Sequence, residues 1–249
     1  MTGSSVLEVI GLRKAFGGIR AVDGVDLCLG PGERRALIGP NGAGKTTLFD
    51  LLTGHLAPDA GAIRFHGERL DGLPPHRVWR RGIARTFQIP AVFANLTVRE
   101  NVQVALLSWR RRTLSLRGRA AGLERERAGA LLGRVGLADH AARPAGVLPY
   151  GDLKKLELSL ALANEPQLLL LDEPTAGMAP AERRALMALV GDIARERGLT
   201  LLFTEHDMDI VFAVADRVTV LHQGRVIADG PPAVVRADPE VQRVYLGAL

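Results

Sequence analysis

Residues 39–46, Gly-Pro-Asn-Gly-Ala-Gly-Lys-Thr, have side chains and a spacing suited to holding a chain of phosphates. Glycines allow successive backbone N–H groups to curl around phosphate oxygens, and the helix expected to follow adds its positive N-terminal end. Lys45 can reach the β- and γ-phosphates, and the Thr46 hydroxyl can coordinate Mg²⁺. The complete phosphate-loop pattern, between an expected strand and an expected helix, predicts nucleotide binding. The predicted nucleotide contacts here are Gly39, Pro40, Asn41, Gly42, Ala43, Gly44, Lys45, Thr46 and Thr47.

A second acidic motif lies far downstream, where four leucines at 168–171 lead into Asp172 and Glu173. An uninterrupted apolar run is typical of a central strand in a parallel sheet, and such sheets bind ligands at their carboxyl edge. We therefore expect Asp172 to hold Mg²⁺ through water and Glu173 to polarise an attacking water. Buried strands also end in acid pairs without any chemical role, so this prediction depends on the phosphate loop upstream.

Three further residues are candidates for contact with the nucleotide. His206 follows the apolar run at 200–203 and is expected at the tip of the strand next to Glu173, within reach of a γ-phosphate. A single histidine is usually structural, but the other five histidines have no comparable setting. Gln88 lies where the sheet is expected to give way to a helical segment, and Phe16 offers an apolar face on which adenine could stack.

These residues need a scaffold, and the pattern along the chain predicts one. Short β-rich runs fill the first forty residues, and positions 97 to about 163 show helical spacing of apolar residues with almost no strand signal. From residue 165 onward strands and helices alternate, which indicates a parallel sheet buried on both faces. The pattern therefore predicts an α/β protein with an inserted helical segment.

The composition fits a globular protein of 249 residues, with 47% hydrophobic and 24% charged residues. A single cysteine, Cys28, excludes an internal disulfide framework, and no apolar run approaches the ~18 residues of a membrane-spanning helix. With no signal-peptide pattern at the N-terminus, we expect a cytoplasmic protein. The arginine cluster at 110–119 has only Trp109 as an aromatic neighbour, so we expect a solvated face or contact with lipid headgroups and no nucleic-acid partner.

Taken in order, these motifs resemble an ABC transporter ATPase over essentially the whole chain. More narrowly, the chain is similar to the ATP-binding subunits of importers for branched-chain amino acids and to their relatives for urea, amides and other amino acids. The similar phrases are ARTFQIPAVFANLTVRENV, LPYGDLKKLELSLALA, DEPTAGMAP, TEHDMDIVFAVADRV and the ending VQRVYLG.

The resemblance implies a single ABC ATPase domain with a P-loop core, a mixed or parallel sheet, an N-terminal antiparallel β subdomain and an inserted helical subdomain. The core and β subdomain would comprise 1–90 and 165–249, and the helical subdomain 91–164, with a signature region at 148–152. It further implies adenine stacking on Phe16, a switching and Mg²⁺-binding role for Gln88, and a γ-phosphate contact for His206.

The same resemblance implies a set of partners. Two ATPase subunits would pair head to tail around two ATP molecules and drive integral-membrane permeases at the cytoplasmic face of the inner membrane. An external solute-binding protein would act indirectly, and residues around 90–98 would contact the permeases. Whether the second ATPase is a copy of this chain or a related one stays open.

The signature region departs from the usual Leu-Ser-Gly-Gly-Gln, since the serine position is Pro149 and the glutamine position is Asp152. Pro149 has no hydroxyl and no N–H, whereas Tyr150 and Gly151 keep backbone N–H groups that could reach the nucleotide of a partner. Proline before a helix with an acid in its first turn is also ordinary helix-start chemistry. Asp152 would weaken a phosphate contact unless Lys154 or Lys155 compensates for its charge.

The loop between the two sites is a second departure from the family pattern. Ala179 stands there where the family prefers an aspartate.

Two other functions are alternatives to import. A soluble ABC protein acting on DNA or the ribosome typically has two ATPase domains, zinc modules or long coiled coils, none of which this sequence indicates. An export-side relative of the lipopolysaccharide-transport type is the other alternative, on the likeness of LPPHRVWRRGIA.

Overall fold

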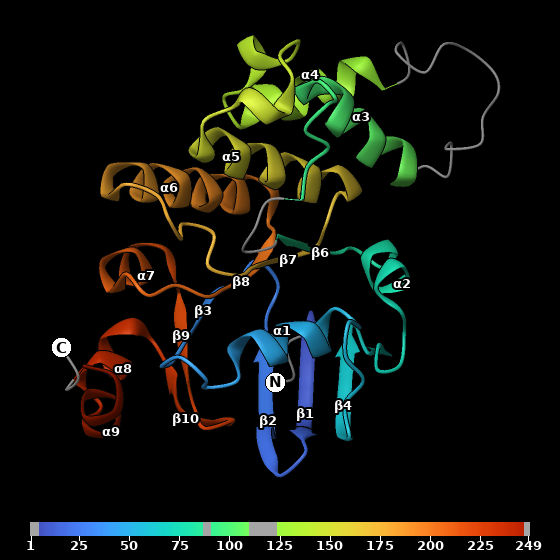
Figure 1. Cartoon of the computed structure of the whole chain (residues 1–249). Helices are drawn as coiled ribbons and strands as arrows, with labels where there is room; N and C mark the ends of the chain where they lie inside the picture. Colours follow the sequence, from blue (N-terminus) through green and yellow to red (C-terminus); the bar gives the residue numbers. More distant parts are fainter. Residues whose placement is uncertain (1–4, 87–90, 110–123, 247–249) are drawn as a thin grey trace.

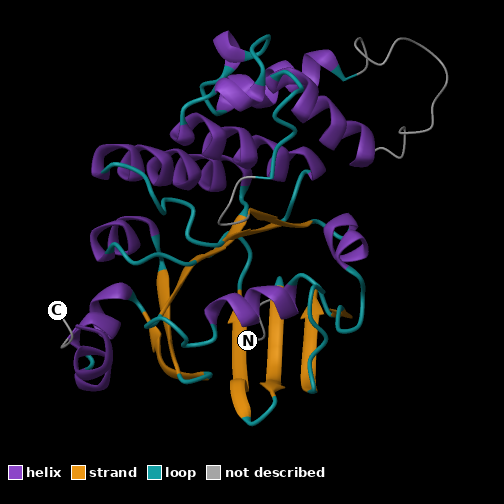
Figure 2. Cartoon of the chain, in the orientation of Figure 1, coloured by secondary structure: helices purple, strands orange, loops and turns teal. Residues whose placement is uncertain are grey.

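The structure is a computed structural model that describes residues 5–86, 91–109 and 124–246. Two β-sheets form its lower and middle parts, and helices gather at the opposite end (Figures 1 and 2). The smaller sheet is antiparallel, with strand order β2-β1-β4-β5. Its strands are β1 (Leu7–Phe16), β2 (Ile19–Leu29), β4 (Ala60–Phe65) and β5 (Glu68–Arg69). The expected N-terminal antiparallel unit is thus confirmed.

The larger sheet has the order β10-β9-β3-β8-β7-β6, and every pair in it is parallel except β9 with β10. Its strands are β3 (Arg34–Ile38), β6 (Ile83–Thr86), β7 (Leu168–Leu171), β8 (Thr200–Phe203), β9 (Arg217–His222) and β10 (Arg225–Gly230). Thr86 is in register with Leu171, and Leu171 with Phe203. The residues that follow β7 and β8 therefore emerge side by side at one carboxyl edge, where parallel sheets bind ligands.

The helices differ in where they lie relative to this sheet. Figure 1 shows α3, α4 and α5 together at one end, α6 between them and the large sheet, and α1 between the two sheets. The helices are α1 (Lys45–Leu52), α2 (Pro75–Arg80), α3 (Val98–Trp109), α4 (Arg125–Arg134), α5 (Tyr150–Ala161), α6 (Pro180–Arg197), α7 (Met208–Val214), α8 (Pro232–Ala237) and α9 (Pro239–Val241). Short 3₁₀ turns span Ala138–His140, Ala145–Val147 and Leu162–Asn164, and a π-helical turn spans Gln242–Leu246.

The strand β7 shows why the large sheet is buried on both faces. Successive side chains of a strand point to opposite faces, so its four leucines divide between two cores. Leu169 and Leu171 pack in the core formed with the helical end, and Leu168 and Leu170 pack in the core formed with α1 and the small sheet. Burial on both faces requires an all-apolar strand, and the prediction of a central strand from residues 168–171 is confirmed.

In the described part of the chain between β6 and β7, the regular elements are all helical. None of the helices among the described residues is long and apolar enough to cross a membrane.

Candidate nucleotide-binding and hydrolysis site

The phosphate loop connects β3 to α1, and its shape depends on close contact with β2. Gly44 precedes the helix with a φ of 103°, in the left-handed region that favours glycine. A Cβ atom at Gly44 would lie 2.1 Å from the carbonyl oxygen of Ala21, so no larger residue fits. The first turn of α1, all of which is described, has no acidic residue to compete with a bound phosphate.

Lys45 turns its side chain back into the loop. Its Nζ donates hydrogen bonds to the carbonyl oxygens of Gly39 at 2.6 Å and Pro40 at 3.1 Å. Burial lowers the pKa of Lys45, while the negative charges of Glu173 and Asp172 act in the opposite direction. Those two carboxylates are therefore close enough to the loop to influence its ammonium group, as the sequence predicted.

The loop is held from its other side by the turn between β9 and β10. The N–H of Gly224 donates to the carbonyl of Ala43 at 2.9 Å, and the N–H of Asp23 donates to the carbonyl of Gly224 at 2.9 Å. Arg225 adds an ion pair with Asp23 at 2.7 Å. These contacts fix the loop between two antiparallel hairpins, one from each sheet.

Asp172 follows β7 directly, and each of its carboxylate oxygens has a protein donor. Its Oδ1 accepts from the Thr204 hydroxyl at 3.0 Å, and its Oδ2 accepts from Nη2 of Arg85 at 2.9 Å. A carboxylate oxygen can accept more than one hydrogen bond, so both keep capacity for a water molecule. The predicted role of Asp172 in holding Mg²⁺ through water stays a prediction with which this geometry is compatible.

Glu173 is held in an uncommon backbone conformation. Its φ is 47°, in the left-handed region, which costs a non-glycine residue about 1–3 kcal/mol. Its N–H donates to Oγ1 of Thr204 at 2.8 Å, which helps to maintain this conformation. The Glu173 side chain then meets His206, with Oε1 and Nε2 separated by 2.7 Å.

His206 is in turn positioned by its neighbour Glu205. The buried Glu205 carboxylate accepts from the backbone N–H of His206 at 3.1 Å and from the hydroxyl of Thr175. Thr175 lies in the segment that follows Glu173 toward α6. One buried carboxylate thus joins the ends of β7 and β8 and leaves the imidazole ring at the surface of the site.

Mg²⁺ requires hard oxygen ligands, and the chain supplies them. The exposed Thr46 stands in the first turn of α1, and the charge of Asp172 acts to raise the pKa of the neighbouring Lys45. One hydroxyl and one water-linked carboxylate beside the phosphates are a donor set suited to this ion. The predicted third ligand, Gln88, lies outside the described residues.

The predicted adenine contact, Phe16, is 48% exposed at the end of β1. It pairs with Ile19, two residues before the Ala21 carbonyl that touches Gly44, so it lies near the loop. Lys14 places its Nζ 5.8 Å from the centre of the Phe16 ring, an arrangement typical of a cation–π contact.

The signature region caps the helix α5. Pro149 precedes its first residue, Tyr150, and the Tyr150 ring lies against Gly177, while Gly151 lies near Met178. Lys155 forms an ion pair with Asp152 at 2.9 Å, so it is the lysine that compensates for the acid. Lys154 is buried, with its Nζ 3.7 Å from Glu157. Ala179 precedes α6 and has no side chain that could cap this helix. Its N–H donates to the Glu182 carboxylate at 3.3 Å.

Three residues of the site were not predicted from the sequence: Arg85, Thr204 and Glu205. Thr204 and Glu205 precede His206 in the quoted TEHD motif, and their strand-end position was a usable signal. Arg85 gave no such signal, because its partners Asp50 and Asp172 are distant in the sequence.

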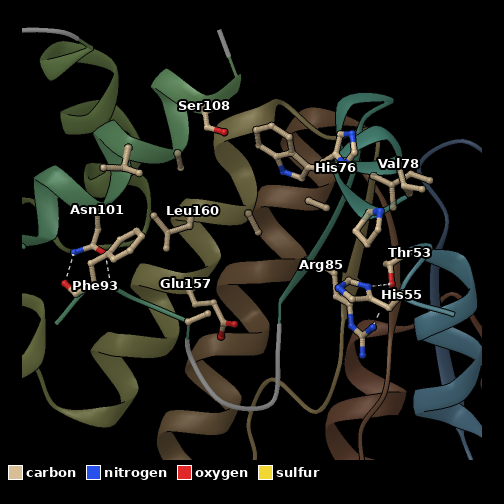
Figure 3. A pocket seen from close by; sticks show the side chains of 18 residues that line it. Thr53, His55, His76, Val78, Arg85, Phe93, Asn101, Ser108, Glu157 and Leu160 are labelled. Carbon is tan, nitrogen blue, oxygen red and sulfur yellow. Dashed lines mark hydrogen bonds between the residues drawn. The ribbon is translucent and has the colours of Figure 1, made fainter. Parts of the chain in front are cut away.

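A cavity of about 470 Å³ is lined in part by Arg85 (Figure 3). Its walls come from α2, β6, α3 and α5 and from the chain just before α3. Its lining residues include Trp79, Arg85, Phe93 and Ala105.

A buried parallel sheet, a phosphate loop and an acidic edge with a histidine define a P-loop nucleotide-binding protein. Residues 22–176 match the family model for the ABC transporter, and residues 225–248 match that of the branched-chain amino acid ATP-binding cassette transporter. The chain therefore belongs to the ABC transporter ATP-binding family, and the resemblance seen in the sequence is confirmed.

Individual relatives support the same conclusion. The chain is 42% identical to the high-affinity branched-chain amino acid transport ATP-binding protein LivG of Escherichia coli K12, over 97% of this chain and 98% of LivG. The crystal structure of the ADP conformation of an ABC transporter cassette superposes with a TM-score of 0.86 at 31% identity, covering 98% and 99% of the two chains. A dimeric post-hydrolysis cassette bound to ADP and Pi gives 0.78 at 25% identity, covering 91% and 98%.

Proposed function

We propose that this protein binds and hydrolyses ATP to drive the import of branched-chain or other amino acids through membrane permeases. The observation that carries the hydrolytic part is the contact of Glu173 with His206, beside an aspartate and a lysine at the same sheet edge. The amino-acid part is supported by the match of residues 225–248 and by the name of LivG. A urea, amide or lipopolysaccharide-export relative has no such support here.

In the proposed reaction each side chain has one task. Lys45 exchanges its two carbonyl partners for oxygens of the β- and γ-phosphates, which favours binding because an ammonium bonds more strongly to an anion than to a neutral carbonyl. Glu173 accepts a hydrogen bond from the attacking water and orients it toward the γ-phosphorus. His206 contacts the γ-phosphate and holds the Glu173 carboxylate. Mg²⁺ bound between Thr46 and Asp172 would supply neutralisation of the phosphate charge.

We also propose a head-to-tail pair of ATPase subunits in which Tyr150 and Gly151 face the nucleotide of the partner. The N-terminus of α5 supports this role, because helix N-termini attract anions and Lys155 neutralises Asp152. The dimeric relative with ADP and Pi supports the pairing itself. In this proposal residues 91–164 form the helical subdomain that presents the signature region.

The permease contact is proposed at the cavity beside Arg85. Its wall is largely apolar, with Trp79 and Ala105 facing the space and Phe93 61% exposed at its rim. A short helix of a membrane permease, with an apolar side chain in the cavity, fits this chemistry. The segment around 90–98 predicted from the sequence forms part of this rim, although Pro90 lies outside the described residues. The ATPase would thus work as a peripheral subunit at the cytoplasmic face of the membrane.

The mass in solution of a Glu173→Gln variant, with and without Mg·ATP, tests the proposal. The change removes the base and keeps the shape of the side chain, so a closed dimer should accumulate only with ATP. The same variant carrying Lys45→Ala is the control and should stay monomeric. An ATP-bound variant that remains monomeric would rule out the homodimer, and undiminished hydrolysis by Glu173→Gln would rule out its role as base.

A further inference from the structure

Arg85 connects three segments of the site. Its Nη1 donates to Oδ1 of Asp50 on α1 at 2.6 Å, and its Nη2 donates to Oδ2 of Asp172 at 2.9 Å. The side chain is only 7% exposed, and its guanidinium lies 5.6 Å from the centre of the Phe49 ring. A planar, always-charged guanidinium can hold two carboxylates in one geometry, which a lysine ammonium does less well.

The two contacts of Asp172 have different consequences for its orientation. The Thr204 hydroxyl holds one carboxylate oxygen and leaves the group able to rotate about its Cβ–Cγ bond. The Arg85 contact holds the second oxygen and so fixes the plane of the carboxylate. Groups that bond a metal-binding carboxylate in this way set its orientation, and their loss weakens metal binding.

The contact with Asp50 adds a second constraint. Asp50 lies four residues after Thr46 on α1, so the two side chains share one face of that helix. By binding Asp50 and Asp172 together, Arg85 ties the carboxylate after β7 to the helix face that carries the Thr46 hydroxyl.

We propose that Arg85 is a positioning residue that fixes Asp172 relative to Thr46 and thereby creates the divalent-metal site. This inference rests on the proposed function, in which Thr46 and Asp172 serve the metal. A guanidinium beside Asp172 has a competing effect, because its positive charge repels a divalent cation. Positioning and repulsion predict opposite changes when Arg85 is removed, so metal affinity distinguishes them.

The experiment uses full-length Glu173→Gln protein with saturating ATP and Mn²⁺ as the probe, with free Mn²⁺ followed by electron paramagnetic resonance. Removing a group that orients a metal ligand typically weakens binding at least about 10-fold, which is the loss expected for Arg85→Gln. Arg85→Lys keeps the charge but reaches one carboxylate at a time, so it should restore only part of the affinity.

Two further variants make the result decisive. Arg35→Gln is the matched control, because Arg35 is also buried and also bridges two carboxylates, Glu33 and Asp229, away from Asp172. It should leave Mn²⁺ affinity unchanged. Asp50→Asn removes the negative charge from the tie to α1, at a side chain that is 30% exposed, so it tests the same idea in a variant that keeps the buried arginine. It too should weaken Mn²⁺ binding.

ATP binding by the parent protein in the presence of Mg²⁺ distinguishes a failure of the proposed function from a failure of the positioning role. Absence of that binding would overturn the proposed function itself, whatever Arg85 does. Normal ATP and Mn²⁺ binding by the parent, with unchanged or tighter Mn²⁺ binding by Arg85→Gln and Asp50→Asn, would overturn the positioning role alone.

Discussion

Nε2 of His206 lies 2.7 Å from Oε1 of Glu173, although 33 residues separate them in the chain. The parallel pairing of β7 with β8 brings them together, because Leu171 and Phe203 are opposite each other and each strand end continues toward the same edge. The imidazole therefore restrains the carboxylate that is proposed to orient water.

Replacing His206 by alanine should lower the rate of ATP hydrolysis by about 100-fold, the scale on which a positioned acid–base group acts. ATP affinity should change little, since Lys45 and the loop remain. Single-turnover hydrolysis and ATP titration measure the two quantities. His140, in the 3₁₀ turn 138–140, provides the control for loss of a histidine. Equal losses in both variants would contradict the role of His206.

Replacing Thr204 by valine should remove one hydroxyl that serves two partners. The hydroxyl donates to Asp172 and accepts from the Glu173 N–H, so its loss leaves buried polar groups unpaired at about 1–3 kcal/mol. Hydrolysis should fall together with the free energy of unfolding, measured in urea. Thr219→Val is the matched control, because Thr219 is buried and donates to Asp229 outside the site. It should reduce stability and leave hydrolysis intact.

Filling the cavity with Ala105→Trp should separate hydrolysis from partner binding. The indole would occupy the space proposed for the permease helix, while the phosphate loop and Glu173 keep their surroundings. Basal ATPase activity of the isolated protein should persist, and co-purification with the permeases should be lost. Ala188→Trp, on the exposed face of α6, is the control. Unimpaired assembly of Ala105→Trp would place the permease elsewhere.

Acid stability should depend on Asp229. Burial acts to raise its pKa, but hydrogen bonds from Thr219 and Arg217 and the charge of Arg35 outweigh it, so the pKa is lowered. A lowered carboxylate pKa stabilises the fold above the ordinary value of about 4 and ceases to do so as the pH falls through the lowered value. The stability difference between wild type and Asp229→Asn should be constant from pH 7 to about 5 and shrink below about 4.

Urea unfolding between pH 7 and 3 measures this difference. Asp192→Asn, which breaks an exposed pair with Arg195, controls for the loss of a surface charge. A difference that stays the same down to pH 3 would show that Asp229 does not contribute in this way.

The sequence predicted what depends on local pattern. The glycines of the loop, the four leucines of β7 and the position of His206 after β8 follow from spacing and strand periodicity, and the fold confirms the elements that they imply. The ion pair of Asp152 with Lys155 could also have been predicted from the sequence, because residues three apart on a helix are neighbours.

What the sequence could not supply was pairing between distant segments. β6 has only two apolar residues among its four and becomes a strand because β7 lies beside it. Nothing in the local pattern predicts that Arg85, near the carboxyl end of β6, is buried, whereas Asp50 and Asp172 hold it inside the protein. The predicted roles of Gln88 and of the 110–119 cluster fall outside the described residues and stay predictions.

Arg85 both lines the cavity and donates a hydrogen bond to the carboxylate of Asp172. A small molecule bound in the cavity would lie against Arg85 without entering the nucleotide site. Such a compound would act on the ATPase without having to outcompete the millimolar ATP of a living cell. This face of the molecule is therefore a starting point for inhibition that does not depend on the phosphate loop.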